Sequence, residues 1–380
     1  MIKLSFQKEE LLKALEYCKS SIEKKSTASI VSHILFKFKG NECDLNATNY
    51  DTTVVVKVSV SESVEEGEIV VPAKYIYDIC KVARGETVLF KYDPSNNILD
   101  ITIEKTKYTV PCLKSDDFPA IPETDKEFTE IEIGKLISYY KKLQFSMTDQ
   151  NVNKAYSGVL LVKPKDSEEN LIEMVTTDIH RLSVLSIKNF SAKIEELEEG
   201  LVIPGKNFFD ISNIFAESKT ALVAVDDEKI FVKGENVLFI SKLLKNEFPN
   251  YKAVVDNHFS SESKESAVIN RKELAEGVKR VVALSSEEKI WATKFNFKGS
   301  TLNMTATSSF GWSSVDEILI DKPFSSDKSI GINAKYLLDV LTVLDKQEVN
   351  MVAEDGLRAL VIMETTDDYQ YIHFVMPLRI

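Results

Sequence analysis

The segment TTDIHRLSV, residues 176–184, places three residues of catalytic type close together: Asp178, His180 and Arg181. A carboxylate beside an imidazole can act as a general-base pair, and a neighbouring guanidinium can hold an anion. One hypothesis is therefore a hydrolase that uses Asp178 and His180. The flanking runs LIEMV and LSVLSI are apolar, however, so the segment between them is typical of a hairpin turn. In such a turn the aspartate caps backbone amides and the histidine is a surface side chain.

The rest of the sequence lacks the motifs that usually accompany nucleotide or acyl chemistry. It contains no GxxxxGK[ST], GxGxxG, GxSxG or HExxH pattern, and only four histidines. Four cysteines, Cys18, Cys43, Cys80 and Cys112, form no CxxC pair, so we expect free buried thiols rather than a zinc site or a disulfide framework. We predict no catalytic residue, no metal and no cofactor.

The composition is that of a globular protein. The chain has 380 residues, of which 44% are hydrophobic and 28% charged, enough for two or three domains. No run of 18 apolar residues occurs and the N-terminal residues contain no signal-type apolar region, so we expect no membrane span and a cytoplasmic protein. The net charge of −12 disfavours a protein that simply coats nucleic acid.

Three similar segments recur along the chain. They are VPAKYIYDICKV (71–82), IPGKNFFDISNI (203–214) and INAKYLLDVLTV (332–343), whose lysines lie 132 and then 129 residues apart. Each reads as a helix that begins after Pro or Asn, and each follows an earlier predicted helix, at 8–20, 134–145 and 270–284. Alternating runs between them predict strands. The fold class is therefore α+β: three tandem domains, 1–125, 126–255 and 256–380, each with two helices packed on antiparallel sheets of about eight strands, joined by polar linkers near 119–127 and 256–266.

Positive charge collects on the predicted helices. At 100° per residue, Lys135, Lys141 and Lys142 lie opposite the apolar face of 134–145, and the helix at 270–284 repeats this arrangement. Acidic residues instead crowd into runs such as SESVEEGE and KIEELEEG. The pattern indicates either ordinary solvated helix faces or a basic surface on an acidic body, which could meet phosphates without reading bases.

Taken in order, several segments resemble one family over the whole chain. VPAKYIYDIC, FSMTDQNVNKAYSG, TTDIHRLSV, ISKLLKNEFPNY, KYLLDVLTVL and VMPLRI are similar to the bacterial DNA sliding clamp, the beta subunit of the replicative DNA polymerase III holoenzyme. The resemblance implies a non-catalytic processivity factor: a head-to-tail homodimer that closes into a ring of six domains around double-stranded DNA, with helices lining the hole. Because topology holds such a ring on DNA without regard to sequence, an acidic exterior is compatible with this function.

The resemblance also implies a pocket between the second and third domains. There the replicative polymerase, the clamp loader and repair proteins would insert short hydrophobic motifs. The matching residues are Thr177, His180, Arg181, Leu182, Tyr156, Pro249, Val254, Tyr336, Phe374, Met376, Pro377 and Leu378. The family commonly has glycine where this chain has Ile179, and rim positions that are basic in some members are Asn153 and Ala253 here. The preferred partner motif therefore stays open.

Two further sets of residues follow for DNA and for the dimer. The family pattern for DNA maps onto Lys24, Lys74, Gln150 and Lys206, and the helix faces add Lys141, Lys142, Lys272, Lys279 and Arg280. At the dimer seam, Tyr108 and Val110 of the strand KTKYTV would pack on Leu284, while Lys105 and Lys107 would face Asp316 and Glu317. Besides the hydrolase, a third hypothesis is a monomeric scaffold that binds peptides and never encircles DNA.

Overall fold

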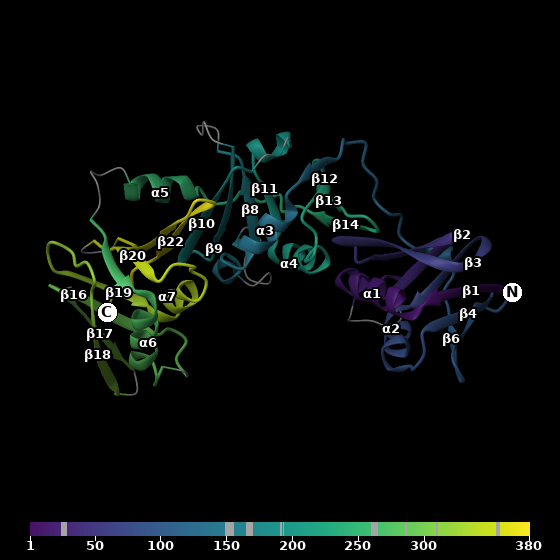
Figure 1. Cartoon of the computed structure of the whole chain (residues 1–380), viewed down its shortest axis with the longest axis horizontal. Helices are drawn as coiled ribbons and strands as arrows, with labels where there is room; N and C mark the ends of the chain where they lie inside the picture. The colour runs from purple at the N-terminus through teal and green to yellow at the C-terminus, as the bar shows by residue number, and fades with distance from the viewer. Residues whose placement is uncertain are drawn as a thin grey trace. The chain divides into compact units, whose positions relative to one another are not determined.

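The computed structural model describes residues 1–23, 29–148, 156–164, 170–190, 192, 194–259, 265–285, 287–308, 311–354 and 358–380, with the backbone alone at 62–64. Within these residues the chain forms seven α-helices and 22 β-strands, as predicted for an α+β protein (Figure 1). No helix in this part of the chain combines the length and apolarity that a membrane crossing needs.

The chain divides into two compact units rather than three. The first comprises Met1–Gly134, Ala192–Ile194 and Lys206–Leu243, and the second comprises Lys135–Ser191, Glu195–Gly205 and Leu244–Ile380. The middle sequence repeat is therefore shared between the two units. The reason lies in the sheets, because each half of this repeat pairs its strands with a neighbouring repeat.

The first unit contains two antiparallel sheets. One has the order β1-β4-β5-β6 and the other the order β2-β3-β14-β13-β12-β7. The bounds of the four-stranded sheet are β1 Ile2–Gln7, β4 Thr87–Asp93, β5 Ile98–Ile103 and β6 Thr106–Pro111. The bounds of the six-stranded sheet are β2 His33–Thr48, β3 Thr52–Pro72, β14 Val237–Lys242, β13 Lys229–Lys233, β12 Ala221–Val225 and β7 Thr129–Ile131.

The second unit repeats this plan with a longer joined sheet. Its eight-stranded sheet has the order β11-β8-β9-β10-β22-β21-β20-β15, and its four-stranded sheet the order β18-β17-β16-β19. The eight strands are β11 Leu201–Pro204, β8 Gly158–Val162, β9 Leu171–Thr177, β10 Arg181–Lys188, β22 Tyr369–Val375, β21 Leu360–Thr365, β20 Glu348–Val352 and β15 Ala267–Asn270. The other four are β18 Ser313–Leu319, β17 Thr301–Thr307, β16 Ala292–Lys298 and β19 Lys328–Asn333.

Six of the helices form where the sequence predicts them, and one, at residues 251–259, was not predicted. Their bounds are α1 Lys8–Cys18, α2 Ala73–Val82, α3 Ile133–Tyr140, α4 Gly205–Ile214, α5 Tyr251–Phe259, α6 Arg271–Val281 and α7 Ala334–Leu341. Asn270 and Asn333 cap α6 and α7, since their side-chain oxygens accept hydrogen bonds from the first-turn amides. In Figure 1, α1 and α2 pack together on the sheets of the first repeat, and α6 and α7 pack together in the third.

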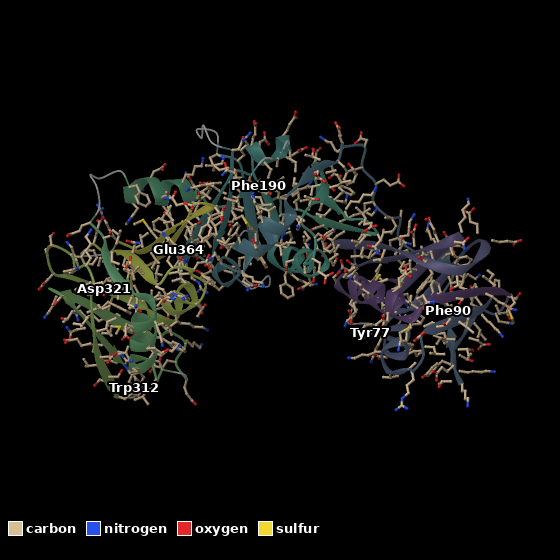
Figure 2. The ribbon with its side chains drawn as sticks, viewed as in Figure 1. Tyr77, Phe90, Phe190, Trp312, Asp321 and Glu364 are labelled. Atoms are coloured by element: carbon tan, nitrogen blue, oxygen red, sulfur yellow. The ribbon has the colours of Figure 1, made fainter. Side chains whose placement is uncertain are left out.

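Alternating burial holds the helices to the sheets. Strand β4 buries every second residue, and α2 buries Ala73, Ile76, Ile79 and Cys80 along one stripe. In the first repeat the rings of Phe6, Phe36 and Phe90 form a buried cluster with centroids 5.1–6.2 Å apart; Phe90 is labelled in Figure 2. All four cysteines are buried and free, as expected.

Three expectations about the elements need correction. The first repeat has six strands rather than about eight, because β2 and β3 are 16 and 21 residues long and replace several shorter strands. The predicted polar linker at 256–266 is helical up to Phe259, where α5 ends. The helix expected at 134–145 ends at Tyr140, after which two 3₁₀-type hydrogen bonds tighten the chain.

Candidate functional site

The segment TTDIHRLSV contains a tight turn between two paired strands. Strands β9 and β10 are antiparallel, and residues 177–181, here called the Asp178 turn, connect them. Asp178 Oδ1 accepts hydrogen bonds from the backbone amides of His180 (3.0 Å) and Arg181 (2.9 Å). Thr177 Oγ1 donates to the Arg181 carbonyl at 2.7 Å and accepts from the Ile179 amide at 3.2 Å. The predicted turn and its aspartate cap are confirmed.

Ile179 occupies the strained position of the Asp178 turn. Its φ is +78°, in the left-handed region that favours glycine, and its side chain is 56% exposed. A β-branched residue in this region is a genuine conformational outlier. The glycine that the family resemblance implies at this position would avoid this strain.

Arg181 is a buried hub rather than a free anion clamp. Its side chain is 9% exposed and its Nε donates to Asp178 Oδ2 at 2.9 Å. Nη1 donates to Asp339 Oδ2 at 2.6 Å, and Nη2 donates to the Phe145 carbonyl. The guanidinium carbon also lies 4.3 Å from the centre of the Tyr336 ring. Arg181 thus holds the turn, helix α7 and the segment after α3 in one arrangement.

These bonds weaken the hydrolase hypothesis. Both carboxylate oxygens of Asp178 are engaged, one by the turn and one by Arg181. The exposed His180 ring instead stacks beside Tyr336, with ring centres 6.4 Å apart and an interplanar angle of 18°. The geometry is that of a structural turn presenting an imidazole.

Several of the predicted pocket residues converge around this turn. The amide of Met376 donates to the His180 carbonyl at 2.9 Å, and the amide of Leu378 donates to the Gly331 carbonyl at 2.7 Å. Pairing of β10 with β22 sets Leu182 opposite Phe374. The C-terminal segment is therefore fixed beside the Asp178 turn.

An apolar cluster lies beneath the same region. Leu182 and Phe374 are buried members of it, and Val254 of α5 packs against it, partly buried. Since Phe374 is wholly buried, it supports the surface from below and does not form part of it. Other predicted residues are partly buried in the same unit and in reach of solvent: Tyr156, Pro249, Tyr336, Met376, Pro377 and Leu378. Ala253 is exposed on α5, and Asn153 lies outside the described residues.

Lys142 corrects the prediction of an exposed basic face. Its side chain is 8% exposed, and its Nζ lies 3.1 Å from Asp345 Oδ1 and 3.6 Å from the buried carboxylate of Glu364. It also donates to the Val343 carbonyl at 2.5 Å. The helical projection failed because α3 ends at Tyr140, so the following turn rotates Lys142 into the interior.

A second buried polar group accompanies Lys142. The ring Nδ1 of His373 lies 2.7 Å from Ser183 Oγ, which in turn lies 2.7 Å from Ser146 Oγ. Burial, followed by the nearby charge of Arg181, lowers the pKa of His373 to about 3. The imidazole is therefore neutral in the folded protein at physiological pH.

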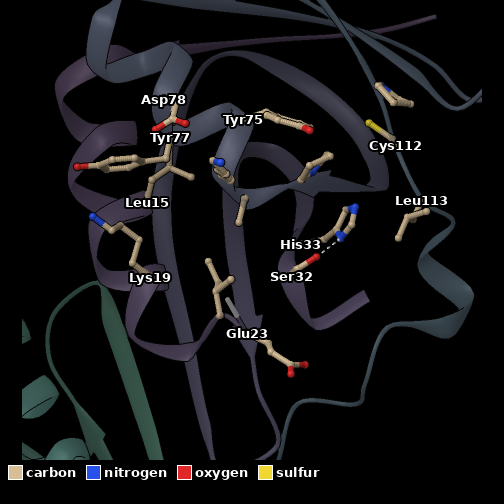
Figure 3. Close-up of a pocket in the computed structure, with 15 residues that line it drawn as sticks. Leu15, Lys19, Glu23, Ser32, His33, Tyr75, Tyr77, Asp78, Cys112 and Leu113 are labelled. Carbon is tan, nitrogen blue, oxygen red and sulfur yellow. Dashed lines mark hydrogen bonds between the residues drawn. The ribbon is translucent and has the colours of Figure 1, made fainter. Parts of the chain in front are cut away.

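The other predicted DNA residues divide into three groups. Lys74, Lys141, Lys206 and Lys272 are exposed. Lys279 and Arg280 are exposed but have acidic neighbours, Glu276 at 3.3 Å and Asp316 at 2.8 Å. Lys24 and Gln150 lie outside the described residues. Lys74 also lines a cavity of about 580 Å³ between α1, α2 and the segment after β6, shown in Figure 3 with Tyr75, Tyr77 and His33 around it.

The predicted seam residues other than Leu284, which lies in the turn after α6, are on or directly before two edge strands. Lys107, Tyr108 and Val110 are on β6, the last strand of its sheet, and Lys105 is in the turn before it. Asp316 and Glu317 are on β18, also the last strand of its sheet. Val110 is 5% exposed within its own chain, whereas Leu284 is 57% exposed.

Sequence reasoning missed two contributors to this site. Phe145 supplies a carbonyl and an aromatic ring to Arg181, and nothing in its local sequence marks it for that role. Asp339, which pairs with Arg181, did carry a signal, because an aspartate recurs at the same position of all three repeated helices.

Comparisons with known proteins agree over the full length. Family models for the N-terminal, central and C-terminal domains of the DNA polymerase III beta subunit match residues 2–122, 130–250 and 258–379. The Beta sliding clamp of Pseudomonas putida is 28% identical over 99% of both chains, and that of Rickettsia bellii is 29% identical over the whole of both. The crystal structure of the DNA polymerase III subunit beta from Pseudomonas aeruginosa is 25% identical, with a TM-score of 0.88 and full coverage of both chains. The chain therefore belongs to the DNA polymerase III beta subunit family.

Proposed function

We propose that this protein is a sliding clamp that closes as a head-to-tail homodimer around duplex DNA and tethers replication and repair proteins to it. As a member of its family it is a non-catalytic polymerase subunit, and we place it in the bacterial cytoplasm, where replication occurs. The domain boundaries at 125/126 and 255/256 belong to this proposal, although α5 runs through the second of them. One structural observation carries the proposal of a ring: two sheets of the described chain are left incomplete at an edge strand, β6 in one and β18 in the other.

The incomplete sheets follow from how neighbouring repeats join. Strand β3 of the first repeat pairs with β14 of the second, and β10 of the second pairs with β22 of the third. The same rule would pair β18 of the third repeat with β6 of a first repeat. Both are edge strands within the described part of the chain, so that pairing requires a second copy. Two copies joined twice in this way would close a ring in which neither β6 nor β18 remains an edge strand.

The chemistry of the two edges supports this pairing. Val315 and Leu319 on β18 are 69% and 74% exposed, which is costly unless another surface covers them. In an antiparallel pair the start of β6, with Lys107, meets the later half of β18, with Glu317. Opposite charges there would fix register and orientation.

The partner site is proposed at the Asp178 turn. Arg181 positions the turn and the Tyr336 ring. The exposed His180 and the partly buried Met376 would offer a polar and an apolar contact for a short hydrophobic motif. The exposed Ile179 side chain would stand at the edge of this site. We propose that DNA is contacted by Lys74, Lys141, Lys206, Lys272, Lys279 and Arg280, and Lys142 is withdrawn from that set.

Retention on DNA tests the ring. Labelled protein is loaded with clamp loader and ATP onto nicked circular plasmid, half of the plasmid is linearised, and both samples pass through a sizing column at moderate salt. A topological ring stays on circles and leaves linear DNA. Equal retention on both forms would indicate ordinary electrostatic binding. Loss of the labelled protein from both circular and linear DNA would favour the monomeric scaffold.

The seam has its own test by analytical ultracentrifugation. Lys107→Glu should raise the dimer dissociation constant at least tenfold, and adding Glu317→Lys should recover part of that loss. Lys91→Glu makes the same charge change on β4 of the same sheet, away from the edge, and should leave the dimer intact. Equal effects of Lys107→Glu and Lys91→Glu would contradict the proposed pairing.

A further inference from the structure

The junction between the first and second repeats contains a large cavity beside another hairpin turn. Its volume is about 1050 Å³, and it lies within the first unit. The walls come from the end of α1 and the segment after it, the turn between β2 and β3, and helix α4.

This second turn, residues 48–52, repeats the hydrogen bonds of the Asp178 turn. Asn49 Oδ1 accepts from the amides of Asp51 (3.1 Å) and Thr52 (2.8 Å), as the Asp178 carboxylate does in its own turn. Thr48 Oγ1 donates to the Thr52 carbonyl and accepts from the Tyr50 amide, as Thr177 does for its counterparts. Tyr50 has a φ of +70°, matching Ile179. The two turns are therefore the same structure in successive repeats.

The helix that faces each turn is also equivalent. Helix α4 carries Lys206 and Asp210 at the repeat positions where α7 carries Lys335 and Asp339. Lys206 and Asp210 both line the cavity. The first junction thus pairs the same turn with the same helix face as the proposed partner site.

Two positions differ in side-chain size between the two junctions. Thr52 stands where Arg181 fills the second junction, and Asn207 stands where Tyr336 stacks on that arginine. Both replacements are smaller, and Asn207 is buried, donating to Ser241 Oγ at 2.9 Å. The first junction therefore lacks the guanidinium and the ring of the second, although neither Thr52 nor Asn207 lines the cavity.

The walls indicate what would fill this space. Tyr50 and Phe209 are 61% and 49% exposed, so two aromatic rings border the cavity in contact with solvent. Four carboxylates, Glu16, Glu23, Asp51 and Asp210, line it against two lysines, Lys19 and Lys206. Lys19 lies 4.1 Å over the Tyr77 ring and Lys242 lies 3.2 Å from Asp51, but an acidic excess remains. The complementary ligand has an apolar or aromatic anchor beside a positive charge.

We propose that this cavity is a second peptide site, which takes a short segment of a partner protein with an aromatic anchor flanked by lysine or arginine. The inference rests on the proposed function, in which the equivalent turn and helix of the second junction receive partner peptides. It differs in charge preference, because the first junction is acidic and lacks the arginine hub. One ring could therefore hold two classes of partner at separate places.

Fluorescence anisotropy with a defined probe tests the proposal. The probe is a fluorescein-labelled peptide, Gly-Lys-Phe-Leu-Arg-Gly, titrated with the full-length protein. Tyr50→Ala together with Phe209→Ala should weaken binding at least tenfold, and raising the salt concentration should weaken it for the unaltered protein. A peptide with glutamate in place of lysine and arginine should bind at least tenfold more weakly. Both replaced side chains are substantially exposed, so thermal melting should show the variant folded.

Two control variants separate this site from its neighbours. Tyr75→Ala removes an exposed ring that borders the cavity of Figure 3 and not this one, and Tyr336→Ala alters the second junction. Binding that survives the Tyr50 and Phe209 changes, fails altogether, or is lost with either control variant overturns the proposal. The partner site of the proposed function is contradicted separately if a hydrophobic partner peptide binds the Tyr336→Ala variant as tightly as it binds the unaltered protein.

Discussion

The strained backbone at Ile179 predicts that glycine at this position makes the protein more stable than alanine does, whereas glycine is usually the less stable of the two. Alanine and glycine both remove the exposed part of the Ile179 side chain beyond Cβ. The difference in stability between the two variants therefore reports the cost of a Cβ at this backbone conformation. At φ +78° an alanine Cβ costs about 1–2 kcal/mol, and glycine avoids this cost. Glycine is also more disordered in the unfolded chain, which offsets about 0.4–1 kcal/mol. The glycine variant should therefore be more stable than the alanine variant by roughly 0.5–1 kcal/mol.

Tryptophan fluorescence during urea unfolding is the appropriate assay. Both tryptophans, Trp291 and Trp312, belong to the second unit, which contains the Asp178 turn, so their emission reports that unit. In thermal unfolding the same difference corresponds to a shift of about 2 °C. Ile290 supplies a matched position, because it is 51% exposed and is not among the residues with positive φ. There the order should reverse, with alanine more stable than glycine by roughly 0.5–1 kcal/mol.

The reasoning is refuted if the alanine variant is more stable than the glycine variant at both position 179 and position 290. If the alanine variant at 179 is as stable as the glycine variant or more stable, the turn does not hold this residue in the left-handed region in solution. The explanation that glycine would avoid strain at this position would then also be wrong. A reversal at 179 alone would support the strain.

Three other perturbations have predictable outcomes. Lys142→Met should destabilise the second unit by about 3 kcal/mol in urea unfolding, because the buried Glu364 carboxylate loses its cationic partner and keeps only neutral hydrogen-bond donors. Adding Glu364→Gln should recover much of the loss, and no recovery would contradict the pairing. Asp339→Asn should lower the free energy of unfolding by about 1–3 kcal/mol, less than the loss of a fully buried pair, because Asp339 is 29% exposed. It should also weaken peptide binding, because Arg181 positions the Tyr336 ring. Unchanged binding would show that Arg181 does not position the peptide site. His373 has a folded pKa of about 3, below its usual 6.5, so the unfolded chain binds a proton that the folded chain does not, and stability falls as pH decreases from about 6.5 toward 3. Between pH 6 and 4.5 this amounts to roughly 2 kcal/mol, so His373→Gln should reduce the change in the free energy of unfolding over that pH range by that amount. An unaltered pH dependence would show that the ring titrates normally.

Local features of the chain were predictable because they depend on residues close in sequence. The Lys–apolar–Asp repeat located α2, α4 and α7, since a helix period and a cap involve only a few neighbouring positions. The Asp178 turn and its exposed histidine followed from turn chemistry within five residues. The family resemblance needed only the order of such segments.

Contacts between distant segments could be seen only in the tertiary structure. Arg181 and Asp339 lie 158 positions apart, and no periodicity links a turn residue to a helix residue across that distance. Lys142 looked like a surface lysine because the helical projection assumed a helix that in fact stops two residues earlier. Only the paired strands revealed that repeats join edge to edge, which gives two units from three repeats and leaves β6 and β18 as edge strands. Propensity and pattern act over a few residues, whereas strand partners and buried ion pairs are chosen by the packing of the whole chain.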